Sequence, residues 1–271
     1  GGMTTTMTPA SAPTTPDAVE APLEGSPGIP FRRLLEVERR KIVDTRSGAW
    51  LLGITALLTA LTLAVMLIWG ESDGLGFMGL LSVATMPLSL LLPILGILTA
   101  TTEWSQRTAL VTFTLEPRRG RVVVAKLLAV VGLSLTVLVL TIVASALFYL
   151  ASTTVRDGPA DWSYEPAVVA KLLLLLTIYL VQGLAFGLLF LNTPAAIVTS
   201  LLLPMVFTVA TTIVGSLERF TAWVDLLVAS EPLMAGSMGG AEWAHLGTAS
   251  LLWLGLPFAV GTWRVLTKEI A

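Results

Sequence analysis

Few residues of this chain are of types that could carry out chemistry. His245 is the only histidine and cysteine is absent, so neither a thiolate nucleophile nor a metal site of Cys and His ligands can form. No G-x-x-x-x-G-K-[ST] phosphate loop occurs, and no acid, base and nucleophile are grouped together. We therefore expect no enzyme, no catalytic residue, no metal and no cofactor in this chain, and we interpret His245 as a residue at a membrane boundary.

The composition places most of the chain in lipid. Its mean hydropathy is +0.84, and 55% of its residues are hydrophobic but only 13% charged, against about 25% charged in a soluble domain. A soluble core could not bury that much apolar surface. The net charge of −2 and the absence of a basic stripe outside the loops give no reason to expect a nucleic acid. The lipid bilayer is the expected surrounding.

Long runs without charge predict the membrane spans. A span needs about 20 apolar residues, and the run from 172 to 217 is long enough for two. One helix over it would reach about 69 Å, more than twice a hydrocarbon core of about 30 Å. We expect it to divide at Asn192-Thr193-Pro194. The predicted spans are 49–69, 76–102, 127–152, 170–191, 194–216 and 246–265, of which the last is short and interrupted by Pro257.

The basic residues predict the orientation. Of 16 Lys and Arg residues, all but Arg156, Lys171 and Arg219 lie before the first run, between the second and third, or after the last. Cytoplasmic loops carry such an excess, so both termini are expected in the cytoplasm, in agreement with an even number of spans. The fold class is an all-α polytopic protein of the cell (inner or plasma) membrane with six transmembrane helices, and residues 48–271 form the transmembrane domain.

The region before the first span has two parts. Gly1 and Gly2 precede Met3 and are interpreted as a remnant of expression; residues 1–29, rich in Thr, Pro, Ala and Ser, are expected to be a disordered cytoplasmic tail. Residues 30–47 predict an amphipathic interfacial helix, although Glu38 interrupts its apolar stripe. The alternative is a basic anchor that only sets topology. The basic residues proposed for this helix are Arg32, Arg33, Arg39, Arg40 and Lys41.

The spans contain few polar groups from which a transport path could be built. Charge within them is expected only at the ends, at Lys171 and Arg264, which disfavours an ion-coupled transporter or a channel. Hydroxyls of the fifth span form a mildly polar wall or simply bond preceding carbonyls, and methionines beside prolines suit an adaptable apolar pocket. The candidate path residues are Met86, Thr199, Met205, Thr208 and Thr212.

Two further features stay open between a functional and a structural interpretation. Residues 218–245 are too polar to span, and their apolar stripe predicts a short helix on or in the outer membrane face, with an ordinary external loop as the alternative. Gly183 and Gly187 form a G-x-x-x-G step that permits close helix packing but also arises by chance in apolar runs rich in small residues. Gln182 is interpreted as a helix-packing residue rather than a substrate ligand.

The loop from Glu103 to Lys126 is the segment most informative about function. It carries apolar residues such as Leu110, Val111 and Phe113 outside the expected spans, and apolar residues outside a membrane need cover. Basic residues next to them suit a docked protein partner with an acidic rim. We expect a helix that leaves the membrane, a Pro-centred turn, and a second short helix that runs into the third span.

This loop resembles that of the type-2 ATP-binding-cassette (ABC) exporter permeases. The shared pattern is Glu103, then Thr108-Ala109-Leu110, a short helix, Pro117 with basic residues, and Ala125-Lys126 at the start of the third span. The departure is Arg107, where that family usually has glycine. The segment Lys41-Ile42-Val43-Asp44-Thr45-Arg46-Ser47 is similar to the end of that family's connecting helix.

The resemblance implies a dimer of permeases, identical or different, with two separate ATPase subunits that bind ATP and Mg. The loop would be the coupling helix on the ATPase, the second and fifth spans would line the substrate path, and re-entrant helices would precede the sixth span. The coupling residues implied are Glu103, Thr108, Phe113, Glu116, Pro117, Arg118, Arg119 and Arg121.

Two functions are consistent with these expectations. The first is the permease subunit of an exporter for an apolar or amphipathic substrate. The second is a non-transporting scaffold, immunity or regulatory protein that docks a cytoplasmic partner through the same loop. They predict the same topology and differ in whether the partner is an ATPase.

Overall fold

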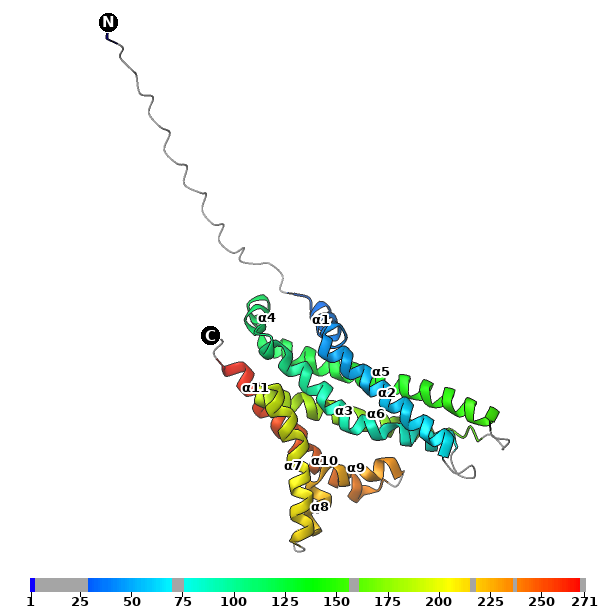
Figure 1. The fold of residues 1–271 in the computed structure, drawn as a ribbon. Helices are drawn as coiled ribbons and strands as arrows, with labels where there is room; N and C mark the ends of the chain where they lie inside the picture. The colour runs from blue at the N-terminus through cyan, green and yellow to red at the C-terminus, as the bar shows by residue number, and fades with distance from the viewer. Residues whose placement is uncertain (3–28, 70–75, 156–160, 215–217, 236–237, 269–271) are drawn as a thin grey trace.

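The all-α fold is confirmed over the part of the chain that the structure describes. The structure is a computed structural model that describes residues 1–2, 29–69, 76–155, 161–214, 218–235 and 238–268, without the side chains of 155, 212, 218, 219, 234 and 235. Every regular element in these ranges is a helix (Figure 1). The predicted disordered tail falls almost entirely outside the described residues.

Six helical segments are long and apolar enough to cross a membrane, so the chain is a multi-pass membrane protein. They are α2 (Arg46–Trp69), α3 (Phe77–Ser105), α5 (Arg119–Val155), α6 (Pro166–Phe190), α7 (Thr193–Ile213) and the segment Gly240–Thr267. The shorter helices are α1 (Phe31–Asp44), α4 (Ala109–Leu115), α8 (Glu218–Val224) and α9 (Leu226–Ala235).

The last span is one continuous helical segment. It consists of α10 (Gly240–Ser250), a π-helical turn (Leu251–Gly255) and α11 (Leu256–Thr267). Pro257 lies in the first turn of α11, where the missing N–H of proline is tolerated, and the wider π turn just before it accommodates the ring. The proline therefore alters the helix without ending it, and the helix starts six residues before the predicted position 246.

The division of the long fourth run lies where the sequence predicts it. Leu191 ends α6 in the left-handed region, with φ of 52°. Asn192 then caps α7, because its Oδ1 accepts the N–H of Ala195 at 3.0 Å, and Pro194 occupies the first turn. These local signals make two helices from one uninterrupted apolar run.

Helix α6 is the centre of the bundle and packs most closely on α3. A Cβ added to Gly183 would lie 1.9 Å from the carbonyl oxygen of Pro93, and one added to Gly96 would lie 2.1 Å from that of Leu180. Only glycine allows the two backbones to approach this closely. The G-x-x-x-G step that begins at Gly183 is thus a helix-packing site, with Gly187 against Ile97 and Ala100.

Helix α1 meets α2 at a sharp corner at one end of the bundle (Figure 1). Thr45 leaves the helical conformation, and its Oγ1 accepts the N–H of Gly48 at 3.2 Å. A Cβ on Gly48 would lie 2.0 Å from the carbonyl oxygen of Ile42, so this corner requires glycine. The corner folds α1 back against α5 and the end of α3.

The segment predicted as an outer helix contains α8 and α9, which Asp225 joins. The buried Asp225 accepts the hydroxyl of Thr208 on α7 at 2.8 Å, and it caps α9 by accepting the N–H of Leu227 at 2.9 Å. Trp253 donates its indole N–H to the carbonyl of Val224 at 2.5 Å. These bonds attach the pair of short helices to α7 and to the last span.

Candidate functional site

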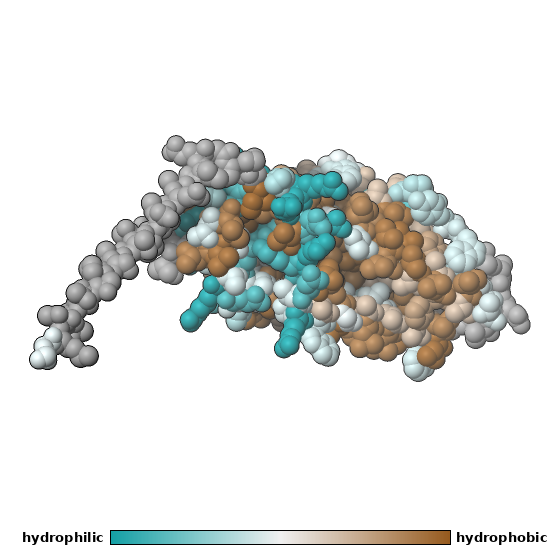
Figure 2. Space-filling view, turned by 90° about the horizontal axis from the view of Figure 1, so that it is seen from above, coloured by the Kyte–Doolittle hydropathy of each residue, from teal (hydrophilic) through white to brown (hydrophobic). Residues whose placement is uncertain are grey.

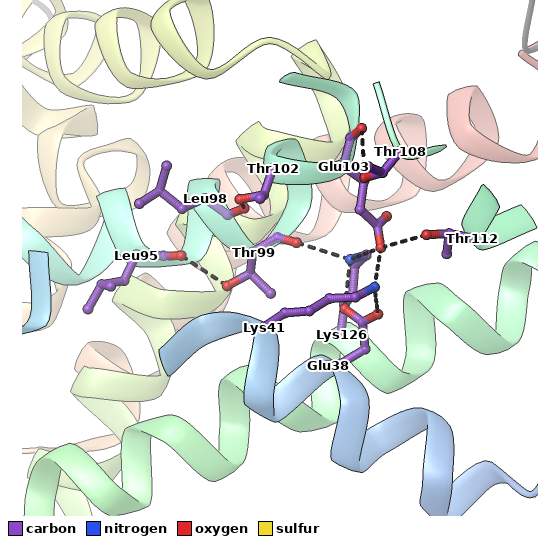
Figure 3. A network of polar contacts seen from close by, with 10 residues as sticks. All are labelled: Glu38, Lys41, Leu95, Leu98, Thr99, Thr102, Glu103, Thr108, Thr112 and Lys126. Atoms are coloured by element: carbon purple, nitrogen blue, oxygen red, sulfur yellow. Dashed lines mark hydrogen bonds and ion pairs between the residues drawn. The ribbon is translucent and has the colours of Figure 1, made fainter. Parts of the chain in front are cut away.

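Four charged side chains meet in a buried cluster where α1, α3 and α5 converge (Figure 3). Lys126 donates to Glu38 Oε2 at 2.7 Å and lies 3.3 Å from Glu103 Oε1. Lys41 donates to Glu38 Oε1 at 2.7 Å and to Glu103 Oε1 at 2.5 Å. We call Glu38, Lys41, Glu103 and Lys126 the charge cluster.

The charge cluster is neutral in sum, which is the condition for burying it. Glu38, Glu103 and Lys126 are each exposed by 3% or less, and unpaired charges at such depth would cost several kcal/mol each. Lys126 also donates to the carbonyl of Thr99 at 3.1 Å. Within the described residues, Glu103 Oε2 has no hydrogen-bond partner; the cavity of about 20 Å³ among these side chains has the volume that one water molecule needs.

Lys41 is the most accessible member of the cluster. Burial lowers the pKa of Lys41, and the carboxylates of Glu38 and Glu103 raise it by more, so that its pKa lies above the ordinary 10.5. Lys41 was expected among the surface basic residues of the amphipathic helix. It instead turns inward, whereas Arg32, Arg33, Arg39 and Arg40 are exposed.

The cluster explains the interruption of the apolar stripe of α1. Leu34, Glu38 and Ile42 are the buried residues of this helix, four positions apart, and therefore lie on one face. Glu38 occupies the middle of that face because it pairs with Lys126, far away in sequence. Glu103 and Lys126 border the predicted spans 76–102 and 127–152 and are buried in α3 and α5.

The turn after α3 is tied to the cluster through Glu103. The N–H of Thr108 donates to the carbonyl of Glu103 at 2.9 Å, and the hydroxyl of Thr112 lies 3.4 Å from Glu103 Oε1. Arg107, directly before Thr108, adopts a φ of 57°. Glycine adopts this left-handed conformation at little cost. This is the position at which the sequence has arginine where the resembling family has glycine.

Helix α4 presents an apolar surface outside the spans. Leu110, Val111 and Leu115 are exposed by 54%, 58% and 66%. Phe113 is buried, with its ring 6.3 Å from that of Trp104 and 5.1 Å from the guanidinium carbon of Arg119. The helix is therefore anchored on one side and open on the other. We call Leu110, Val111 and Leu115 the α4 surface.

The residues after α4 differ from the expectation in one respect. The short helix lies before Pro117, and no separate short helix follows it, because α5 runs unbroken from Arg119 to Val155, starting before the predicted position 127. Proline at 117 removes a donor and so separates α4 from α5. Glu116 is buried and accepts both the N–H of Arg118 at 3.3 Å and Arg121 at 2.6 Å.

Two arginines after Pro117 bind the backbone just before α1 and at the end of α11. Arg121 donates to the carbonyl of Ile29 at 2.8 Å, and Arg119 donates to the carbonyls of Val265 and Lys268 at 2.9 and 2.7 Å. Arg118 is exposed. Of the three arginines implied as coupling residues, Arg119 and Arg121 thus have intramolecular roles, and Arg118 is the one free to meet a partner.

Among the described side chains, the two candidate path methionines lie on the exposed surface and not in a closed cavity. Met86 on α3 and Met205 on α7 are exposed by 66% and 63%. Thr199 is half-buried, Thr208 bonds Asp225, and the side chain of Thr212 lies outside those described. Their role in a path stays a prediction. His245 packs edge-on against Trp223, with ring centroids 4.3 Å apart.

Sequence reasoning named Glu103 as a coupling residue and Lys41 as a basic residue of the amphipathic helix, and it predicted neither the charge cluster nor the role of Asp225. A charged residue that breaks an apolar stripe is the signal that could have found Glu38.

Comparison of the chain with protein-family models, with curated proteins and with solved structures finds no match.

Proposed function

We propose that this chain is the transmembrane permease subunit of an ABC exporter. It moves an apolar or amphipathic substrate, such as a drug, an antibiotic, a lipid or a peptide, across the inner or plasma membrane. Separate ATPase subunits, which bind ATP and Mg, dock on the loop 103–126. The observation that carries the proposal is the α4 surface, which is exposed and apolar although it lies outside the spans.

The contacts behind the α4 surface would let a docked partner act on the spans. Phe113 packs against Trp104 at the end of α3, and Thr112 reaches Glu103 in the charge cluster. The cluster in turn joins α3 to α1 and α5. A movement of α4 would therefore shift three helices together, and differential binding of the partner to two arrangements of them is enough to drive a cycle.

We further propose that α7 faces a second permease protomer, identical or different. Its residues Val198, Leu202, Val206 and Ile213 are each more than half exposed, so lipid or another protein must cover them. The exposed positions of Met205 and Thr208 on the same helix would then lie at the junction of two protomers. The apolar character of this face supports an apolar or amphipathic substrate.

The test is a pull-down of the solubilised chain from its native membrane, with an ATPase assay of what co-purifies. Leu115→Asp and Arg118→Glu should each reduce the recovered ATPase activity at least fivefold, because they place negative charge on the docking surface. Tyr164→Asp, at an exposed residue of the loop between α5 and α6, is the matched control and should leave recovery unchanged.

Two outcomes would overturn the proposal. A partner without ATPase activity, lost with Leu115→Asp, would favour a scaffold, immunity or regulatory protein. Retention of a fully active ATPase by both variants would show that the α4 surface is not the docking site.

A further inference from the structure

A half-open groove of about 420 Å³ lies between α1 and α5. Its size falls within the range of small-molecule sites. One wall comes from the polar face of α1 and the other from the start of the apolar part of α5. The lining residues are Glu36, Arg39, Arg40, Ile42, Val43, Asp44, Ala129, Gly132, Leu133 and Thr136.

The α5 wall lies at a depth that suits one acyl chain. Lys126 is the last charged residue before the apolar run of α5, and Thr136 follows ten residues later. At 1.5 Å per residue this is about 15 Å, which is half of a hydrocarbon core of about 30 Å. The groove lies along Ala129 to Thr136, about 10 Å of α5, and so within the first leaflet that this helix crosses after Lys126.

The groove is open at its apolar wall and continuous with exposed apolar surface. A Cβ built on Gly132 would meet no atom within 4 Å. Next to it on α5, Leu128 and Leu135 are exposed, as is Val43 on α1. Figure 2 looks onto the end of the bundle that carries α1 and α4, where hydrophilic side chains lie beside a broad hydrophobic surface.

The charged residues of the groove all come from α1, with equal numbers of positive and negative groups. Arg39 and Arg40 supply two guanidinium groups, and Glu36 and Asp44 supply two carboxylates. Arg40 pairs with Glu36 at 2.8 Å in an exposed ion pair, which costs little to rearrange. Within the described residues, neither Arg39 nor Asp44 makes an ion pair.

We propose that this groove binds a zwitterionic phospholipid with a primary amine, of the phosphatidylethanolamine class. The phosphate lies on Arg39 and Arg40, the ammonium donates to Asp44, and an acyl chain lies along Gly132 and Leu133. Guanidinium groups bind phosphate with charge-assisted hydrogen bonds, and an ammonium has three N–H donors for carboxylates. Choline has no N–H donor, and an anionic headgroup would leave the two carboxylates opposed by negative charge.

The proposal does not depend on transport and would stand if the chain were a scaffold. Its test is native mass spectrometry of the full chain in detergent, titrated separately with phosphatidylethanolamine, phosphatidylcholine and phosphatidylglycerol of identical acyl chains. We expect the first lipid to reach half occupancy at a concentration at least fivefold lower than the other two.

Five variants, two of them controls, locate the binding. Gly132→Leu fills the open wall and should weaken phosphatidylethanolamine binding at least fivefold; Gly53→Leu on α2, where an added Cβ also meets no atom within 4 Å, should not. Arg39→Gln should weaken binding, whereas Arg33→Gln on the same helix should not. Asp44→Asn should remove most of the preference for phosphatidylethanolamine over phosphatidylcholine.

Four results would overturn the proposal. Equal binding of the three lipids would indicate a non-selective lipid belt. Tightest binding of phosphatidylglycerol would indicate attraction to the basic helix as a whole. No effect of Gly132→Leu, or no binding of any of the lipids, would mean that the groove has another occupant.

Discussion

Glu38 is the residue on which the junction of α1 with the bundle depends. It is 1% exposed and accepts both lysines of the charge cluster. Glu38→Gln keeps the shape but leaves the buried Lys126 with one more distant carboxylate, so we expect a loss of about 3 kcal/mol in the free energy of unfolding. The measurement is unfolding by SDS in mixed micelles.

Two comparisons make this prediction specific. Glu36→Gln, two residues away in an exposed ion pair, should cost no more than about 1 kcal/mol. Glu38→Gln combined with Lys126→Gln should cost less than the sum of the single changes. Strict additivity would mean that the pair does not contribute to stability as a pair.

Lys41 predicts how the stability of the cluster depends on pH. Since its pKa in the folded chain lies above 10.5, the contribution of Lys41 is fully present below that pH and is lost as the pH rises through the folded pKa. The difference in unfolding midpoint between the parent chain and Lys41→Gln should be constant from about pH 7 to 10 and should shrink above 10.5. A difference that already shrinks near neutral pH would contradict the assignment.

Arg107 lies in a conformation that favours glycine. Its φ of 57° costs a residue with a Cβ about 1 to 2 kcal/mol. Arg107→Gly should therefore raise the free energy of unfolding by about 1 kcal/mol, and Arg107→Ala should not raise it, because alanine keeps the Cβ. A gain with alanine equal to that with glycine would show that the arginine charge, not the backbone, is responsible.

At the scale of elements, the crossing of α3 and α6 is set by glycines. Gly183→Ala would bring a Cβ to 1.9 Å from the carbonyl oxygen of Pro93, so the helices must separate, at a typical cost of 1 to 3 kcal/mol. Gly132→Ala, in open space on α5, is the control and should cause no loss. The midpoints of thermal unfolding in one detergent compare the two. A Gly183→Ala protein as stable as the control would mean that this crossing does not limit stability.

The spans could be predicted from sequence, but the contacts between them could not. Runs without charge located all six helices, and Asn192-Thr193-Pro194 located the turn, because each depends on neighbours along the chain. The pairing of Glu38 with Lys126 depends on how α1 folds back at Gly48. Likewise, Asp225 was missed because its partner Thr208 lies on another helix. The periodicity of apolar residues predicts which face of a helix is buried, but it does not predict which helix packs against that face.

For the residues that the resemblance implies as coupling residues, the sequence did not predict which ones bind within the chain and which stay exposed. Phe113, Glu116, Arg119 and Arg121 hold the loop to the rest of the chain. Arg118 and the α4 surface remain available to a partner. Neighbouring arginines cannot be distinguished from the sequence alone. The fold shows which of them donate to an acceptor within the chain.

At the scale of the whole molecule, the start of α1 and the end of α11 lie at one end of the bundle. Arg121 reaches Ile29, just before α1, and Arg119 reaches Lys268, just after α11, so these two residues lie at the same end of the bundle as α4 (Figure 1). An even number of spans requires this arrangement, and the basic residues predict that this end faces the cytoplasm.

The absence of cysteine allows the orientation to be tested cleanly. Single cysteines at Arg118, beside α4, and at Tyr164, at the opposite end, would be the only thiols in the chain. Both parent residues are exposed. In intact cells a membrane-impermeant maleimide should label Tyr164→Cys at least tenfold faster than Arg118→Cys, and permeabilisation should equalise the rates. Faster labelling of Arg118→Cys in intact cells would reverse the orientation, placing the α4 surface where no cytoplasmic ATPase could reach it.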